Sequence, residues 1–228
     1  MSDQKKLYEY LAGFLREERK EKFERNVRLR TRYVTIAVED IYQPHNASAV
    51  LRSAECFGVQ DVHIVENRNK YVPNPDVVMG ASKWLSLHRY GGEKNNTLNC
   101  IRALKKNGYR IIATTPHRKD CLISELDLSK GKLALFFGTE NEGLSPEILQ
   151  EADEFVKIPM YGFTESFNIS VSAAICLYEL IPKLQRSGIH WQLSEEEQAE
   201  ILMQWVRSSL QRPELLEDEF RKKQSAGE

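Results

Sequence analysis

The chain has 228 residues and a mass of 26.4 kDa, with 41% hydrophobic residues, 29% charged residues and a formal net charge of −1. This composition excludes disordered, collagen-like and low-complexity classes, and the near-neutral charge argues against a protein that coats nucleic acid generically. The length fits one globular domain with helical appendages.

The four cysteines are expected to be free thiols. They lie far apart and form no CxxC or Cys/His pair, so the sequence predicts neither a disulfide framework nor a metal site. The first 30 residues are rich in charge, and no run of 18 apolar residues follows. We therefore expect a soluble cytoplasmic protein that does not contact a membrane.

The N-terminal segment, residues 3–28, carries a broken helical stripe of apolar residues and is expected to form a charged helix. Apolar runs and helical patterns then alternate. The expected strands are residues 33–38, 61–65, 84–87, 109–114, 133–137 and 155–158, and the expected helices are residues 47–57, 97–107, 168–185 and one that begins at Ser194. This alternation predicts an α/β domain with a parallel sheet covered by helices on both faces.

Charge is distributed unevenly between the two ends of the chain. Residues 1–32 contain ten basic and six acidic residues, whereas residues 192–228 contain nine acidic and five basic residues. The basic segment is compatible with an RNA contact, and also with a helix face that is merely solvated. We expect an N-terminal helical extension over residues 1–30, a central domain over residues 31–186 and a C-terminal helical extension over residues 187–228.

A first polar cluster follows the first expected strand. Asn46 lies where a helix is expected to begin and would serve as its N-cap, and Arg52 lies within that helix. A guanidinium there could line a crevice at the strand ends, or it could be an ordinary surface charge. Each residue alone therefore leaves a structural and a functional interpretation open.

Two further clusters follow later strands. Residues 137–147 contain two glycines and three glutamates directly after the most apolar strand, and residues 158–174 join a strand end, a glycine loop and a helix start rich in Ser and Asn. The phosphate-loop spacings GxxxxGK[ST] and GxGxxG are absent, so hydrolysis of nucleoside triphosphates is disfavoured. All three clusters are expected at the carboxyl ends of strands, where parallel sheets bind ligands.

Together, the three clusters resemble the signature motifs of the SpoU (TrmH) family of RNA ribose 2′-O-methyltransferases, within the SPOUT superfamily. The resemblance covers about residues 33–186, with Asn46 to Gly58, Gly138 to Leu144 and Ile158 to Ser172 as its three motifs. One position departs from the pattern: Phe167 stands where the family commonly has Leu. This exchange should still pack against an adenine ring but should change its fit.

The resemblance implies a deep trefoil knot at about residues 133–186, S-adenosylmethionine as the cofactor, and a homodimer whose active site combines both subunits. It also implies which residues line the cofactor pocket: Thr114, Gly138, Asn141, Gly143, Ile158, Met160 and Phe167. The catalytic residues that it implies are Arg52, Asn46, Glu140, Ser166 and Asn168. Glu140 would fix the crevice by pairing with Arg52, and no metal is expected.

The role of Arg52 is open at this stage. A guanidinium is a poor base in water, so Arg52 either accepts the proton of the ribose hydroxyl or anchors a phosphate and stabilises the developing alkoxide. Asn46 would orient Arg52 or the ribose, while Ser166 and Asn168 would hold the third loop and the ribose.

The substrate implied by the resemblance is RNA. A chain of this length with short helical extensions resembles the enzymes that methylate guanosine 18 in the D-loop of tRNA. Ribosomal RNA is the alternative substrate, and a catalytically silent RNA-binding homologue is a further alternative. Individually weak candidates for the RNA surface are His45, Arg68, Lys70, Lys83 and Arg118.

Overall fold

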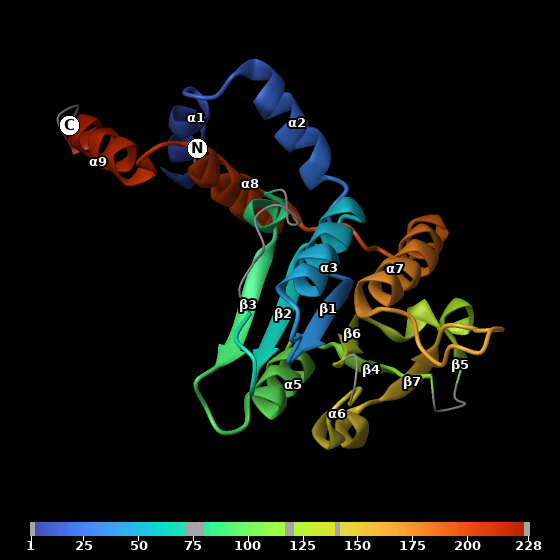
Figure 1. Cartoon of the computed structure of the whole chain (residues 1–228). Coiled ribbons are helices and arrows are strands. Elements are labelled where there is room, and N and C mark those ends of the chain that lie inside the picture. The colour runs from blue at the N-terminus through green and yellow to red at the C-terminus, as the bar shows by residue number, and fades with distance from the viewer. Residues whose placement is uncertain (1–2, 72–79, 117–120, 140–141, 226–228) are drawn as a thin grey trace. The chain divides into compact units, whose positions relative to one another are not determined.

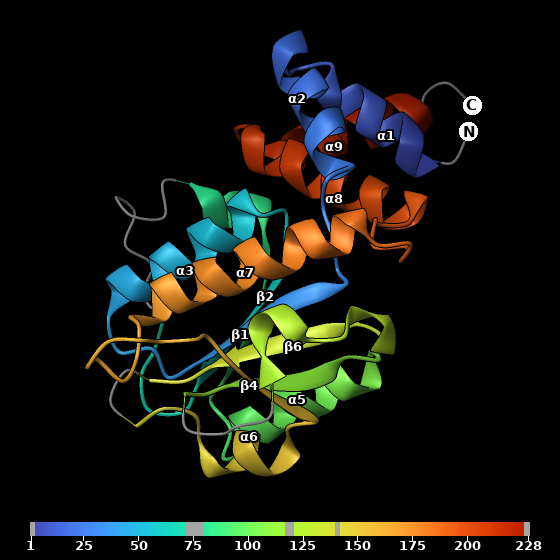
Figure 2. The same cartoon turned by 90° about the vertical axis from the view of Figure 1, so that its right-hand side faces the viewer.

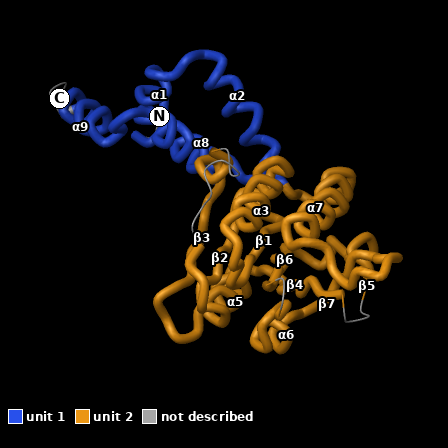
Figure 3. The backbone as a smooth tube through the Cα atoms, in the orientation of Figure 1, with its two compact units in different colours: residues 1–30, 192–228 blue, residues 31–191 orange. Residues whose placement is uncertain are grey.

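The computed structural model describes residues 3–71, 80–116, 121–139 and 142–225. The chain divides into two compact units, residues 1–30 with 192–228 and residues 31–191, which we call unit 1 and unit 2 (Figure 3). The chain passes into unit 1 at Gln192, five residues after the boundary that we expected from the sequence.

Unit 2 contains a seven-stranded sheet (Figure 1). Its strands are β1 (Val34–Glu39), β2 (Asp61–Glu66), β3 (Ser86–Gly91), β4 (Arg110–Thr114), β5 (Cys121–Leu122), β6 (Leu133–Phe137) and β7 (Glu154–Lys157), in the spatial order β3-β2-β1-β6-β4-β7-β5. All neighbouring strands run parallel. The central strands β1 and β6 are buried along their whole length, as their mainly apolar sequences predict.

Helices cover both faces of the sheet, which confirms the expected fold class (Figure 2). One face packs against α3 (Pro44–Cys56) and α7 (Ile169–Arg186), and the other packs against α5 (Asn96–Lys106) and α6 (Pro146–Glu151). Short 3-10 helices span Ala81–Trp84, Ile123–Glu125 and Leu128–Lys130. The trefoil knot remains a prediction.

Several helix ends follow local sequence signals. Gly58 and Gly108 follow the C-caps of α3 and α5 with φ angles of 76° and 79°, a conformation that glycine adopts without steric cost. The Ser145 side chain accepts a hydrogen bond from the N–H of Ile148 at the start of α6. Because these signals act within a few residues, the sequence alone places these ends.

Two expected elements differ in the structure. The N-terminal helix is split into α1 (Asp3–Ala12) and α2 (Glu17–Val27). The third strand begins at Ser86, because Trp84 belongs to a 3-10 helix, and it continues to Gly91. This strand carries several exposed residues, so its sequence lacks the apolar run that marks the other strands.

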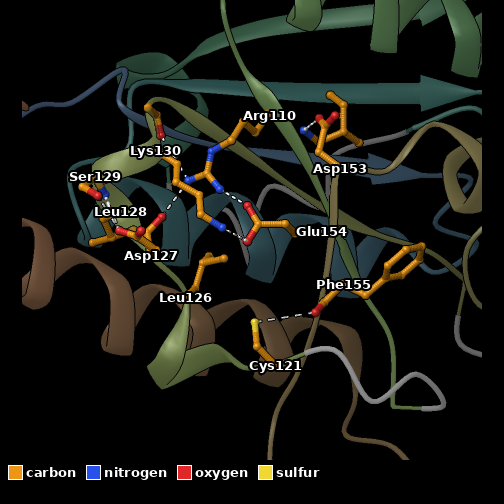
Figure 4. Close-up of polar contacts among 12 residues, drawn as sticks. Arg110, Cys121, Leu126, Asp127, Leu128, Ser129, Lys130, Asp153, Glu154 and Phe155 are labelled. Atoms are coloured by element: carbon orange, nitrogen blue, oxygen red, sulfur yellow. Dashed lines mark hydrogen bonds and ion pairs between the residues drawn. The ribbon is translucent and has the colours of Figure 1, made fainter.

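A polar cluster fixes the amino ends of β4 and β7, at the end of the sheet away from the predicted site (Figure 4). Arg110, the first residue of β4, pairs with Glu154, the first residue of β7, and donates to the carbonyl oxygen of Asp127 at 2.8 Å. Lys130 completes the cluster at 3.2 Å from the second oxygen of Glu154. The pairing satisfies charges that are mostly shielded from solvent, so its role is structural.

Unit 1 is helical. It contains α1, α2, α8 (Glu195–Ser209) and α9 (Pro213–Ser225). The rings of Phe23 in α2 and Trp205 in α8 pack with centroids 5.5 Å apart, and the guanidinium of Arg30 lies 5.2 Å from the Trp205 ring. Tyr10 in α1 similarly contacts Phe220 in α9 at 5.3 Å. The two terminal extensions therefore share one small core. No helix in the described part of the chain is long and apolar enough to cross a membrane.

Candidate active site

A cavity of about 340 Å³ opens at the carboxyl ends of β4, β6 and β7. Its lining comes from the last residues of these strands, the segments that follow them, α6 and the first half of α7. The lining residues are Thr114, Thr115, Pro116, Phe137, Gly138, Thr139, Glu142, Gly143, Leu144, Leu149, Val156, Lys157, Ile158, Met160, Ser166, Phe167, Ile169, Ser172 and Cys176. The volume lies within the range usual for small-molecule sites. We call this space the first cavity.

Most of the predicted cofactor residues meet in the first cavity. Thr114, Gly138, Gly143, Ile158, Met160 and Phe167 line it, as does Ser166, which we expected on the catalytic side. Glu140 and Asn141 lie outside the described residues, and so does the expected pairing of Glu140 with Arg52. Residues of the second and third motifs therefore converge on one space with Thr114, which lies 53 positions before Phe167. No residue of the first motif lines this cavity.

The turn after β6 brings two backbone segments into close contact. Thr139 and Gly143 exchange backbone hydrogen bonds of 3.0 and 3.1 Å. A Cβ atom on Gly138 would lie 2.0 Å from the carbonyl oxygen of Gly143, so no other residue fits there without moving the backbone. Gly143 itself has a φ of 72°, which also favours glycine. The glycines of this motif shape the wall of the first cavity.

Asn46 and Asn168 are 122 positions apart, and the fold joins their side chains. The Nδ2 of Asn168 lies 3.2 Å from the Oδ1 of Asn46. Asn168 also caps α7, since its Oδ1 accepts bonds from the N–H and the hydroxyl of Ser170 at 2.9 and 2.7 Å. The bond therefore connects the first and third motifs at the starts of α3 and α7.

The expected N-cap role of Asn46 is wrong. The N-cap of α3 is Gln43 and Pro44 is its first residue, so Asn46 lies inside the first turn, where its side chain is buried with 4% exposure. Proline is favoured at the first helical position because its missing N–H has no partner there in any case. Asn46 does not cap α3, and its buried side chain contacts Asn168 of the third motif. We therefore assign it a role other than helix initiation.

Arg52 lies on α3 and is exposed. It lines neither the first cavity nor a second cavity, which the next paragraph describes. Within the described residues it forms no hydrogen bond or ion pair. Six positions along a helix turn the side chain away from the face of Asn46. Within one chain, the structure therefore does not bring Arg52 to the predicted cofactor residues.

A second cavity of about 410 Å³ shares part of this wall, namely Thr139, Glu142, Gly143 and Leu144. Its floor contains the buried Glu39, whose carboxylate accepts bonds from the Thr97 hydroxyl at 2.5 Å and from the Ser145 N–H at 3.0 Å. These two hydrogen bonds stabilise the Glu39 carboxyl group, because a buried polar group without hydrogen-bond partners costs free energy.

Comparison with known proteins identifies the family of this chain. The sequence profile of the SpoU rRNA Methylase family matches residues 33–178, which includes the walls of the first cavity. The chain belongs to the SpoU rRNA methylase family.

Several relatives carry a specific name. A tRNA (guanosine(18)-2′-O)-methyltransferase of Borreliella burgdorferi is 42% identical over 91% of this chain and 93% of its own length. A protein of the same name from Thermus thermophilus is 33% identical over 84% of this chain and 97% of its own length. The chain thus matches these relatives over nearly their whole length.

Solved structures agree with this assignment. The crystal structure of the A. aeolicus TrmH/SpoU tRNA modifying enzyme superposes with a TM-score of 0.76 at 27% identity, covering 86% of this chain and 98% of that one. The SpoU methyltransferase AviRb from Streptomyces viridochromogenes, solved with the cofactor AdoMet, shares the fold with a TM-score of 0.60 at 22% identity, over 72% of this chain and 65% of that one.

Sequence reasoning missed several lining residues of this SpoU site. Thr115 and Pro116 extend the segment after β4, and the N–H of Thr115 donates to the carbonyl oxygen of Val156 at 3.0 Å. Their position directly after Thr114 could have indicated them. Lys157 precedes Ile158 and is the one cation among the described lining residues. Leu149, in α6, and Cys176, in α7, lie outside the three motifs and were not predicted.

The titratable groups of the first cavity offer little acid-base or metal chemistry. Burial raises the pKa of the Cys176 thiol to about 12, so this group stays protonated and is a poor nucleophile. Among the described residues, no group of three His, Cys, Asp or Glu side chains could hold a metal ion. The geometry instead suits a reaction that depends on positioning a ligand that is already reactive.

Proposed function

We propose that this chain transfers a methyl group from S-adenosylmethionine to the ribose 2′-hydroxyl of guanosine 18 in tRNA. The observation that carries the proposal is the near full-length match to the B. burgdorferi tRNA (guanosine(18)-2′-O)-methyltransferase. That match spans 208 residues, whereas unit 2 contains only 161. The match therefore includes residues of unit 1 as well as the domain that holds the site.

The first cavity fits the cofactor. Leu144, Ile158, Met160 and Phe167 offer apolar surface for an adenine ring, while the Gly138–Gly143 turn allows close approach of backbone groups. Lys157 supplies a positive charge for the carboxylate of the methionine part. The cofactor supplies an electrophilic methyl group on its sulfonium sulfur, so the protein needs no metal to activate it.

The motif residues position the ribose. Asn168 uses its Oδ1 for the α7 cap and one N–H for Asn46, which leaves its second N–H for a ribose oxygen. Ser166, at the rim of the first cavity, is the second ribose contact. In-line placement of the 2′-oxygen provides most of the acceleration.

Arg52 acts, in this proposal, on the site of a partner subunit. A guanidinium carries a positive charge and donates hydrogen bonds, so we assign Arg52 to an RNA phosphate and to the negative charge that develops on the 2′-oxygen. Several large side chains on or beside the third motif are exposed and would be covered in a homodimer: Tyr161 (96%), Phe163 (108%), Val171 (43%) and Tyr178 (70%).

Mixing two inactive variants tests the shared site. Arg52→Ala and Asn168→Ala homodimers should each be inactive. After co-refolding, about a quarter of the sites would combine an intact Arg52 with an intact Asn168 from the other chain, so about a quarter of the activity should return. If mixing restores nothing, Arg52 does not act across a dimer.

The basic face of unit 1 is the proposed RNA contact. Lys22, Arg25 and Arg28 are exposed at spacings of three along α2 and its C-cap. Phosphate contacts of this kind give affinity without sequence choice. We place the protein in the cytoplasm on the basis of this tRNA substrate.

Transfer of labelled methyl to unmodified tRNA and, in parallel, to protein-free ribosomal RNA tests the proposal. Label at the 2′-oxygen of guanosine 18, abolished in Arg52→Ala, is the expected result. Label in ribosomal RNA alone would overturn the substrate and keep the chemistry. Cofactor binding without label in either RNA would support the catalytically silent alternative.

A further inference from the structure

One ion pair joins the wall of the first cavity to the loop that follows β2. Arg68 makes a bidentate contact with Glu142, with its two terminal nitrogens 3.1 and 2.6 Å from the carboxylate oxygens. Glu142 lines both cavities, whereas Arg68 lines only the second. The pair therefore lies where the two cavities share a wall.

Hydrogen bonds to Asp40 fix the backbone of the loop that carries Arg68. The Oδ1 of Asp40 accepts the backbone N–H groups of Asn67, Arg68 and Asn69 at 2.7, 2.8 and 3.2 Å. Asp40 is itself buried and has a φ of 50°, a strained conformation that persists only where the surroundings determine it. The loop that carries Arg68 is thus anchored to the end of β1.

The Glu142 side belongs to the turn that shapes the first cavity. The N–H of Glu142 donates to the Thr139 hydroxyl at 3.0 Å, next to the paired backbone bonds of Thr139 and Gly143. A displacement of Glu142 would therefore be transmitted to the backbone beside Gly138. The Arg68 guanidinium also holds the pKa of the Glu142 carboxyl below its usual value.

We propose that Arg68 is a positioning residue: through Glu142 it holds the wall of the first cavity in place and raises the affinity for S-adenosylmethionine. This inference rests on the proposed function, since it takes that cofactor as the ligand. Both side chains are largely exposed, at 69% and 61%, so the effect is modest and falls as salt increases.

Calorimetric titration with S-adenosylmethionine at low salt tests the proposal. Arg68→Gln and Glu142→Gln should each raise the Kd about two- to fivefold, the double variant should be no worse than either, and the swap R68E/E142R should recover most of the affinity. Unfolding midpoints should stay equal in all of them. Lys105→Gln breaks the exposed Lys105–Glu151 pair between α5 and α6 and should leave the Kd unchanged.

Each alternative outcome is informative. Equal affinity in all variants, with tight binding by the wild type, would overturn the role of Arg68 and leave the proposed function intact. Weak binding by Glu142→Gln alone would mean that Glu142 contacts the cofactor directly, which also overturns it. If the wild type does not bind S-adenosylmethionine, the proposed function fails first.

Discussion

Unit 2 and unit 1 are built in different ways. Unit 2 encloses a sheet whose central strands are fully buried, and the family match at residues 33–178 lies entirely within it. Unit 1 consists of four charged helices that share a small core around Phe23 and Trp205. Unit 2 therefore provides a rigid framework for the reaction site, whereas unit 1 provides a charged surface, which we assign to RNA binding.

Gly138→Ala should abolish cofactor binding. The new Cβ would lie 2.0 Å from the backbone oxygen of Gly143, so the turn must open and the wall of the first cavity must move. We expect a loss of roughly 100-fold or more in affinity for S-adenosylmethionine, or more than about 2.7 kcal/mol. Calorimetry measures this loss. Gly188→Ala, where a Cβ meets nothing within 4 Å, is the matched control, and equal affinities in both variants would contradict the account.

Acidification from pH 7 to about 4.5 should destabilise unit 2, because the buried His63 lies in that unit. Burial, together with the neighbouring His88, lowers the pKa of His63 to about 4. A histidine whose pKa is lowered in the folded state takes up its proton more readily when unfolded, so stability is lost as the pH falls from about 6.5 towards 4.

The contribution of His63 to this loss should be about 2 kcal/mol. Chemical denaturation at pH 7 and pH 4.5 measures it, and His63→Gln should flatten the dependence. Trp205→Phe leaves Trp84 and Trp191, both in unit 2, as the fluorescent reporters. An unchanged pH profile in His63→Gln would show that another group is responsible.

Removal of the basic face of α2 should weaken tRNA binding. The triple variant Lys22→Ala/Arg25→Ala/Arg28→Ala should lose roughly tenfold in affinity and should reduce the salt dependence, because fewer phosphates are neutralised. Filter binding at several salt concentrations measures both quantities. The triple variant Arg221→Ala/Lys222→Ala/Lys223→Ala removes the same charge from α9 in the same unit and should bind nearly as wild type. Equal losses in the two triple variants would indicate a general charge effect.

The smallest change in stability is expected for the bond between Asn46 and Asn168. Asn168→Ser can keep the cap on α7 but cannot reach Asn46, so stability should change by only a few tenths of a kcal/mol while methyl transfer falls. Asn168→Ala should lose about 1 kcal/mol of stability as well. Denaturation and single-turnover transfer separate the two effects. Full activity in Asn168→Ser would show that the bond to Asn46 is only structural.

The sequence was sufficient for elements whose signals are local. Apolar runs predict β1 and β6, and the Ser194/Glu197 capping box marks the start of α8. The motif glycines and Phe167 line one cavity, and its role as the cofactor pocket stays a prediction. These features depend on a few neighbouring residues, or on the rule that parallel strands end at the same edge.

Features that depend on distant residues could not be predicted in this way. The sharing of one core by α1, α2, α8 and α9 joins the two ends of the chain, and the Arg68–Glu142 pair spans 74 positions. The position of Asn46 depends on Pro44, whose preference for the first helical position outweighed the capping tendency of Asn. A local pattern gives no sign of such pairings, because their energy comes from tertiary packing.

The most direct test of the division between the two units is to measure both ligands on both variants. Gly138→Ala should lose S-adenosylmethionine and keep tRNA affinity, whereas the triple variant of Lys22, Arg25 and Arg28 should lose tRNA affinity and keep the cofactor. The account predicts that each variant loses affinity for one ligand and keeps its affinity for the other. If either variant loses both ligands while remaining folded by circular dichroism, the reaction site and the RNA surface are not separate, and the account is contradicted.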